Sequence, residues 1–281
     1  MFGGGNGESG TPAHVGYKNK EDGSTANPYS ADGNVNVDIK GGTVNQVFGG
    51  SNAHGSIKGA IAIGINQDGT CPLNLGEVFG GGNMTSGPAG EITIGCTGDQ
   101  TIDYIYGGAN QADVTGDIVL NIKGGRFNNV YGGNNISGTI TGTITVNVDW
   151  QGDCDNYLGN VFGGGNLAKY ETPSGKPNYP QVNIKNGVVS GSVYGGGNGD
   201  PNSTTQEPGS VEGNPQVTIG IEDEARRAIV RGNVYGGGNS AKVTGDTFIE
   251  LKYKSKVLGN VYGGGNMAPV SGDTKVIVNG K

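Results

Sequence analysis

Short stretches of alternating apolar and polar residues recur along the whole chain. In residues 35–39, 61–65, 118–122 and 144–148 every second residue is Val, Ile or Leu, and the residues between them are mostly polar or small. A period of two predicts β-strands with one face on a core and the other in water. The abundance of glycine and β-branched residues disfavours helix. The pattern therefore predicts an all-β protein.

A glycine-rich phrase recurs in step with these strands. Its full form is Val-Tyr-Gly-Gly-Gly-Asn, as at residues 234–239 and 261–266, and its aromatic residue recurs every 25 to 46 positions, at Phe2, Phe48, Phe79, Tyr106, Tyr131, Phe162, Tyr194, Tyr235 and Tyr262. Self-similarity at such a period indicates a repeat architecture. We will call this segment the repeat phrase.

The shortest repeat of 25 residues fits one turn of a parallel β-helix. The sequence predicts a right-handed parallel β-solenoid of about 8–9 coils of 25 or more residues, forming a single domain over residues 1–281. Each coil would hold three strands: the repeat phrase, a short stub such as residues 241–245, and an alternating strand. A β-propeller is the alternative, but its blades of about 40 to 50 residues are longer than this unit.

Longer units carry inserts, and the two ends of the chain fall inside repeats. The inserts at residues 167–180 and 199–215 follow the phrase in consecutive coils, so we expect them to lie side by side. The chain starts within one copy of the phrase and stops within the next unit, where solenoids usually have polar caps. We therefore expect it to be a fragment of a longer protein.

Alternation within the phrase assigns each position a side. Gly, Asn or Asp stands three residues before every aromatic from Phe48 onward, which predicts a corner or bulge there. Beyond that corner, Val is expected to point inward and the aromatic outward. Two interpretations of the aromatic row remain open: the rings stack on one another over bare glycine backbone, or they form a flat platform on which sugar rings lie.

The asparagine that ends the phrase predicts a structural ladder. In-register stacking would place like on like, so that each amide donates to the asparagine of the next coil. The predicted members are Asn52, Asn83, Asn110, Asn135, Asn166, Asn198, Asn239 and Asn266, with Asn6 as an earlier copy.

If a binding face exists, the late tyrosines beside the inserts are the best candidates. They are Tyr194, Tyr235 and Tyr262 in the aromatic row, together with Tyr170 and Tyr179 in the insert 167–180. Aromatic rings on a glycine floor suit a glycan ligand.

Composition and charge exclude several classes of partner. The net charge is -7 and Lys and Arg are scattered, which argues against nucleic acid and against an anionic membrane surface. No apolar run of 18 residues exists, so we expect no membrane insertion. Cys71 and Cys96 lie one coil apart and could pair, although their different offsets from the aromatics favour free thiols; Cys154 has no obvious partner.

Catalytic and metal-binding patterns are not evident. The aspartates after the stub strand, Asp117, Asp246 and Asp273, recur at one offset and are typical of turns. Two histidines cannot supply a histidine-rich zinc site, and no phosphate-binding loop or nucleophile motif occurs. We expect no catalytic residues, no metal and no cofactor.

The repeated Val-Tyr/Phe-Gly-Gly-Gly-Asn, followed by Val-x-Gly-Asp and a Val-x-Ile strand, resembles the glycine-rich repeats of large adhesin-like surface proteins of gut Bacteroidetes. The resemblance covers nearly the whole chain. It implies a cell-surface or secreted β-solenoid used for attachment to a host or dietary glycan or to a surface protein. Two other classes stay open: a polysaccharide lyase or hydrolase on the same scaffold, and a fibre segment that associates end to end through uncapped strands.

Overall fold

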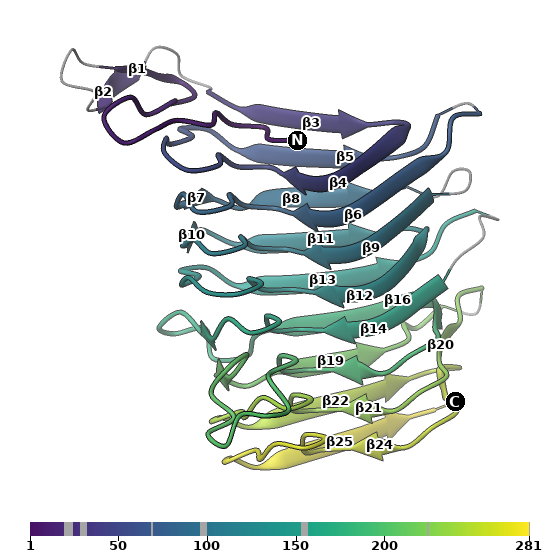
Figure 1. The fold of residues 1–281 in the computed structure, drawn as a ribbon. Helices are drawn as coiled ribbons and strands as arrows, with labels where there is room; N and C mark the ends of the chain where they lie inside the picture. Colours follow the sequence, from purple (N-terminus) through teal and green to yellow (C-terminus); the bar gives the residue numbers. More distant parts are fainter. Residues whose placement is uncertain are drawn as a thin grey trace.

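The chain forms a single stack of β-coils. The computed structural model describes residues 1–19, 25–28, 33–68, 70–95, 100–152, 157–223 and 225–280. Every regular element among them is a strand, and the coils wind into a β-solenoid of about eight turns, with the direction of winding right-handed (Figure 1). The predicted fold class is confirmed.

The alternating strands form one wall of the solenoid, which we call the back sheet. Each strand pairs in parallel with its counterpart in the next coil, residue for residue, as Ile118 does with Ile144. Its members are β3 (Val35–Ile39), β5 (Ile61–Ile65), β8 (Gly90–Ile94), β11 (Ile118–Ile122), β13 (Ile144–Asp149), β16 (Gln181–Val189), β19 (Gln216–Ile219), β22 (Thr247–Lys252) and β25 (Thr274–Asn279).

The strands that end in the repeated aromatic form a second wall, the front sheet. Its members are β4 (Gly42–Phe48), β6 (Leu73–Phe79), β9 (Gln100–Tyr106), β12 (Arg126–Tyr131), β14 (Tyr157–Phe162), β17 (Val193–Tyr194), β20 (Ala228–Val230), β21 (Val234–Tyr235), β23 (Lys256–Val257) and β24 (Val261–Tyr262). The end of β16 also joins this sheet, where Val189 pairs with Val230. The front sheet thus continues through all the coils.

The corner predicted three residues before the aromatic appears as a break in pairing. Val44 pairs with Leu75 and Gln46 with Glu77, while the residue between them in each strand has no bridge partner. Such a break is the mark of a local irregularity that turns the strand.

Short strands after the repeat phrase form a third wall, the corner ladder. They are β7 (Gly87–Pro88) paired with β10 (Val114–Thr115), and β15 (Tyr170–Glu171) paired with β18 (Val211–Glu212), all in parallel. Outside the stack, β1 (Tyr17–Asn19) and β2 (Thr25–Pro28) form an antiparallel hairpin.

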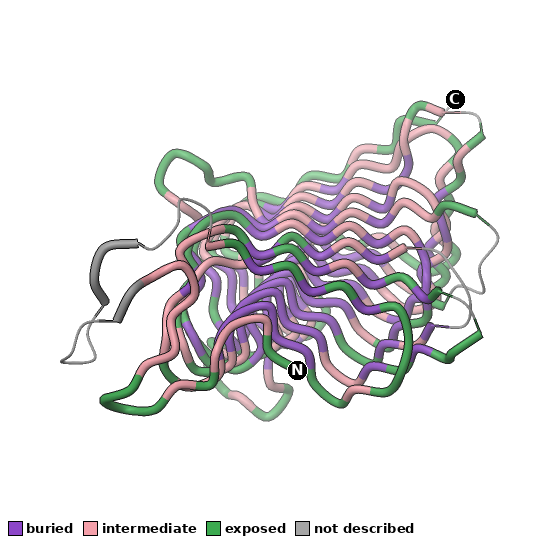
Figure 2. The backbone as a smooth tube through the Cα atoms, turned by 90° about the horizontal axis from the view of Figure 1, so that it is seen from above, coloured by how far each residue is buried: buried purple, intermediate pink, exposed green. Residues whose placement is uncertain are grey.

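The main core lies between the front and back sheets. Inward side chains from the coils before the last, such as Val47, Ile63 and Leu120, are buried in it, and buried residues line the inside of the tube while exposed ones gather at the loops (Figure 2). A smaller second core lies behind the corner ladder and includes Val114, Ile140, Tyr170, Val211 and Val243. Alternation thus directs half of each strand into a shared interior.

Close stacking explains the first glycine of the repeat phrase. A β carbon built on Gly80, Gly107 or Gly132 would lie well inside 3.0 Å of the carbonyl oxygen of the equivalent glycine in the next coil. Since no side chain fits there, glycine is required by the approach of neighbouring coils rather than by a loop that holds a ligand.

Candidate binding surface

The repeated aromatics stack into a continuous ladder through the whole solenoid. Neighbouring rings lie 4.6 to 5.0 Å apart between centroids, with interplanar angles of 4 to 12°. The ladder runs from Phe2 to Tyr262 without interruption. We refer to it as the aromatic ladder.

The aromatic ladder lies on the side of the front sheet away from the main core. The amide of Asn233, an outward position two residues before the ring, donates to the hydroxyl of Tyr235 at 3.0 Å, so both side chains are on one side of the strand. The rings form a cluster separate from the main core. The side predicted by alternation is therefore correct.

Stacking nevertheless buries the rings. From Phe48 to Tyr235 each ring is at most 8% exposed, and only the two end rings, Phe2 and Tyr262, have a face without a partner ring in the described ladder. Desolvation by burial raises the pKa of Tyr131 to about 12 and also raises the pKa of Tyr106 and Tyr194. The row does not present a flat platform of ring faces to solvent, because each face is occupied by the next ring.

The five tyrosines predicted as a binding face do not lie together. Tyr194, Tyr235 and Tyr262 belong to the aromatic ladder, whereas Tyr170 is buried in the second core and Tyr179 packs against it. The Tyr170 hydroxyl donates to the carbonyl of Gly142 at 3.1 Å, and burial raises its pKa. Of the five, Tyr262 alone is exposed; ligand binding by any of them stays a prediction.

The asparagines hydrogen-bond along the stack as the sequence analysis expects. In each step the amide nitrogen donates to the side-chain oxygen of the preceding coil, at 2.6 to 3.0 Å, in the order Asn6, Asn52, Asn83, Asn110, Asn135, Asn166, Asn198, Asn239, Asn266. This asparagine ladder fixes the coil corner beside the second core.

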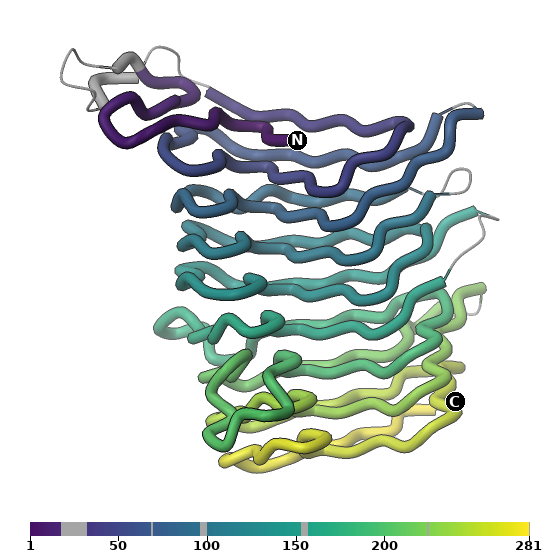
Figure 3. The backbone as a smooth tube through the Cα atoms, in the orientation of Figure 1, coloured from purple at the N-terminus to yellow at the C-terminus, as the bar shows by residue number. Residues whose placement is uncertain are grey.

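The two inserts lie side by side, as predicted from their consecutive coils. Strand β15 of one pairs with β18 of the other, and the amide of Asn214 donates to the carbonyl of Pro177 at 2.7 Å. The insert 199–215 also crosses the following coils (Figure 3). There the Gln206 side chain donates to the carbonyl of Met267 at 2.6 Å, and Lys242 pairs with Glu207. The inserts thus form one ordered edge.

The recurring acidic residues support turns. Asp117 accepts from the amide of Thr143 at 2.7 Å and Asp246 from the amide of Asp273 at 2.8 Å. The amide of Thr143 is the main cause of the lowered pKa of Asp117. Within the described ranges no group of three or more His, Cys, Asp or Glu side chains is placed to hold a metal ion.

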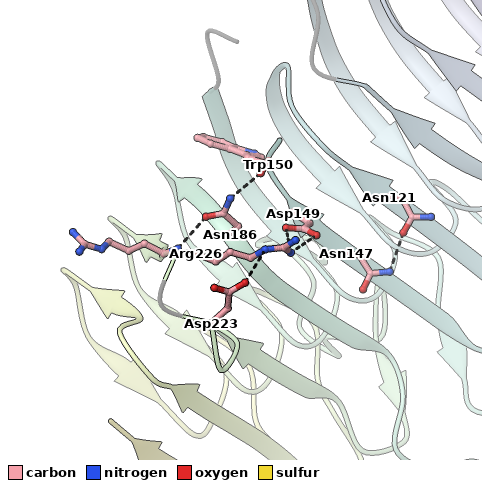
Figure 4. Close-up of polar contacts among 8 residues, drawn as sticks. Asn121, Asn147, Asp149, Trp150, Asn186, Asp223 and Arg226 are labelled. Carbon is pink, nitrogen blue, oxygen red and sulfur yellow. Dashed lines mark hydrogen bonds and ion pairs between the residues drawn. The ribbon is translucent and has the colours of Figure 1, made fainter. Parts of the chain in front are cut away.

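An ion-paired cluster occupies the opposite corner, where the back sheet turns into the front sheet. The Arg226 guanidinium donates to both carboxylate oxygens of Asp149 at 2.8 Å and lies 3.4 Å from Asp223 (Figure 4). Asn186 donates to the backbone oxygen of Trp150 at 2.7 Å. Since Arg226 and Asp149 are 77 residues apart, this contact joins the segment that carries Arg226 to an earlier coil.

Two exposed tyrosines were missed by the sequence analysis. Tyr104 of β9 and Tyr157 of β14 are 36% and 43% exposed on the outer surface of the front sheet. Tyr104 pairs with Asn129 of β12, and Tyr157 pairs with Arg126 of the same strand. The signal was present for Tyr104, which occupies the outward position two residues before a ladder aromatic where other coils carry polar residues.

Two of the three cysteines lie outside the described residues, so the pairing of Cys71 with Cys96 stays untested. Cys71 is exposed, while Cys96 and Cys154 lie in segments that the structure does not describe. No segment of the described chain forms a helix with the length and apolarity needed to cross a membrane.

No protein-family model, curated protein or solved structure matches this chain.

Proposed function

We propose that the chain is a non-enzymatic, adhesive segment of a cell-surface or secreted protein, with a host or dietary glycan as its ligand. The observation that carries this proposal is the uninterrupted pair of ladders, aromatic and asparagine, that tie every coil to the next. Ladders of this kind make a stiff rod that holds surface groups at fixed spacing. A rod with ordered inserts along one edge is better suited to attachment than to enzymatic catalysis.

The carboxylates also support a non-enzymatic role. Glycoside hydrolysis uses two carboxyl groups that converge on one cleft. The aspartates that recur in this chain instead cap backbone amides of the next coil, as Asp113 does for Thr139 at 2.7 Å and Asp117 for Thr143. Their position is explained by coil stacking.

The outer surface around β12 is the glycan-binding face that we propose. Tyr104 and Tyr157 lie on the strands on either side of β12, which contributes Arg126 and Asn129 between them. Exposed rings supply apolar area, and the Arg126 guanidinium supplies hydrogen-bond donors. Asn129 is held in a fixed position between the rings, because its side-chain oxygen accepts from the amide of Asn160 at 2.9 Å. A sugar ring that stacks on an aromatic side chain needs both the apolar area and the hydrogen-bonding groups.

A glycan array probed with the wild-type chain tests the proposal. We expect binding that is lost in the Tyr104→Ala/Tyr157→Ala variant and kept in Tyr262→Ala, which removes the one exposed ring of the late ladder tyrosines. Loss of glycan binding in Tyr262→Ala alone would place the binding site at the Tyr262 end of the aromatic ladder. Absence of binding to any glycan would contradict the glycan part, and release of reducing ends from a plant or mucin polysaccharide would contradict the non-enzymatic part.

A further inference from the structure

Within the described residues the corner ladder is interrupted twice. No bridge joins Ile57 to Gly87, where the gap holds only about 10 Å³, and a second interruption lies in the middle of the stack. Above this second interruption, Gly87 pairs with Val114 and Val114 with Ile140. Below it, Tyr170 pairs with Val211, which continues through Val243 to Val270. Within the described chain no bridge joins Ile140 to Tyr170, although the same two coils pair directly in the front sheet through β12 and β14.

An open groove of about 660 Å³ lies at this interruption. One side is formed by residues 136–141 of the upper coil and the other by residues 167–169 and 171–174 of the lower coil. Ile136 and Leu167, at its inner end beside the asparagine ladder, are 44% and 37% exposed. The insert that begins at Leu167 diverts the lower coil from its neighbour, which opens the groove.

Both walls of the groove direct backbone groups into it. The amide of Val114 donates to the carbonyl of Thr139, and the amide of Thr141 donates to the carbonyl of Val114. The backbone groups of Thr139 and Thr141 that make these bonds therefore point to the coil above, away from the groove. Alternation along a strand then points the N–H and C=O of Ile140 into the groove. On the lower wall, Tyr170 and Thr172 donate to the following coil, which leaves the backbone groups of Glu171 facing the groove.

The threonine hydroxyls of the walls are already engaged. Thr139 donates to Asp113 at 2.9 Å, Thr141 accepts from the amide of Gly116 at 3.2 Å, and Thr172 donates to the carbonyl of Glu212 at 3.2 Å. Lys169 pairs with Glu212. Ser137, Ser174 and Glu171 also line the groove, so a sugar is the alternative that the test must exclude, but the backbone groups and apolar side chains of the walls favour a peptide strand.

We propose that this groove binds an extended peptide, which continues the interrupted ladder as an added strand. The peptide hydrogen-bonds Ile140 on one side and Glu171 on the other, and places an apolar side chain against Ile136 and Leu167. Strand addition of this kind uses backbone bonds for affinity and side-chain pockets for specificity. The occupant has the character of the strands that fill the ladder elsewhere, as in Ala-Asp-Val-Thr-Gly at residues 112–116 and Ala-Lys-Val-Thr-Gly at residues 241–245. This inference concerns a peptide partner and does not depend on glycan binding at the front sheet.

NMR titration of the isotopically labelled chain tests the inference. The probe is the acetylated, amidated peptide Ala-Lys-Val-Thr-Gly, and the expected result is saturable shifts of the Ile140 and Glu171 amides. Leu167→Ser should weaken binding by about tenfold, the order expected when a leucine-sized apolar contact is lost. Met84→Ser is the matched control, because Met84 follows Asn83 as Leu167 follows Asn166 and is 55% exposed away from the groove.

Two further arms make the result decisive. A peptide N-methylated at its valine lacks one backbone donor and should bind more weakly than the parent. Absence of saturable shifts at Ile140 and Glu171, or equal affinity for Leu167→Ser and wild type, would overturn the inference. So would saturation of these amides by cellohexaose when the peptide produces none, since the groove would then be a glycan site.

Discussion

A β carbon added to Gly107 would meet the carbonyl oxygen of Gly132 in the next coil. The same relationship holds for the first glycine of each phrase from Gly49 to Gly236. The glycines of the repeat phrase therefore record how closely the coils approach, and this contact yields the first prediction.

Gly107→Ala should destabilise the solenoid, because neither the carbonyl nor the adjoining strand can move without disturbing the parallel ladders. Overpacking of this kind costs about 1 to 3 kcal/mol. Urea unfolding followed by circular dichroism measures the change. Gly87→Ala is the control, since a β carbon there meets no atom within 4 Å; equal losses in the two variants would contradict the steric explanation.

Asn135→Ala should be more costly than Asn266→Ala. Asn135 donates to Asn110 and accepts from Asn166, at 2.9 Å in both bonds, whereas Asn266 makes the last described bond of the ladder. A buried polar group that loses its partner costs about 1 to 3 kcal/mol. Thermal unfolding of both variants compares the two positions, and a larger loss at Asn266 would show that the ladder does not act through its interior bonds.

Tyr131→Phe should be nearly neutral, while Tyr131→Leu should destabilise. Phenylalanine already occupies the equivalent positions at Phe79 and Phe162, and Tyr131 stacks on Tyr106 at 5.0 Å and on Phe162 at 4.9 Å. Leucine keeps most of the apolar volume but loses both ring contacts, each worth roughly 0.5 to 1.5 kcal/mol. Chemical unfolding of the pair separates stacking from burial, and equal stability of the two variants would deny stacking a role.

Alkaline pH should unfold the chain through its buried tyrosines. Burial raises the pKa of Tyr131 from 10.0 to about 12, a difference of roughly 3 kcal/mol in favour of the neutral phenol. Because the folded pKa is the higher one, this stability is fully present below pH 10 and is lost as the pH rises through about 12.

Tyrosinate absorbance and circular dichroism, recorded together over this range, test the pH prediction. The ionisation of the buried tyrosines should coincide with loss of β-structure. Tyr131→Phe should retain its structure to a higher pH than wild type. Ionisation of all tyrosines without loss of structure would contradict the buried position of the ladder.

The sequence alone specified the ladders because stacking repeats one environment in every coil. A residue recurring at one offset meets its own copy, so Asn110, Asn135 and Asn166 could be paired by counting. The same logic gave the period, the fold class and the side of the strand on which each ring of the aromatic ladder lies. Alternation is a local property of the backbone, and it survives in the structure.

The tertiary structure decided which side chains are covered and where the corner ladder is interrupted. Alternation places Tyr131 on the outer side of its strand but does not say what lies against it. Of the two interpretations that the sequence left open, the structure has the stacked rings, which form a buried column and not a flat platform. Tyr170 was grouped with the ladder tyrosines, yet its insert carries it into the second core. The interruption between Ile140 and Tyr170 has no sequence signal either, because it depends on how far an insert displaces one coil from its neighbour, a distance set by non-local packing.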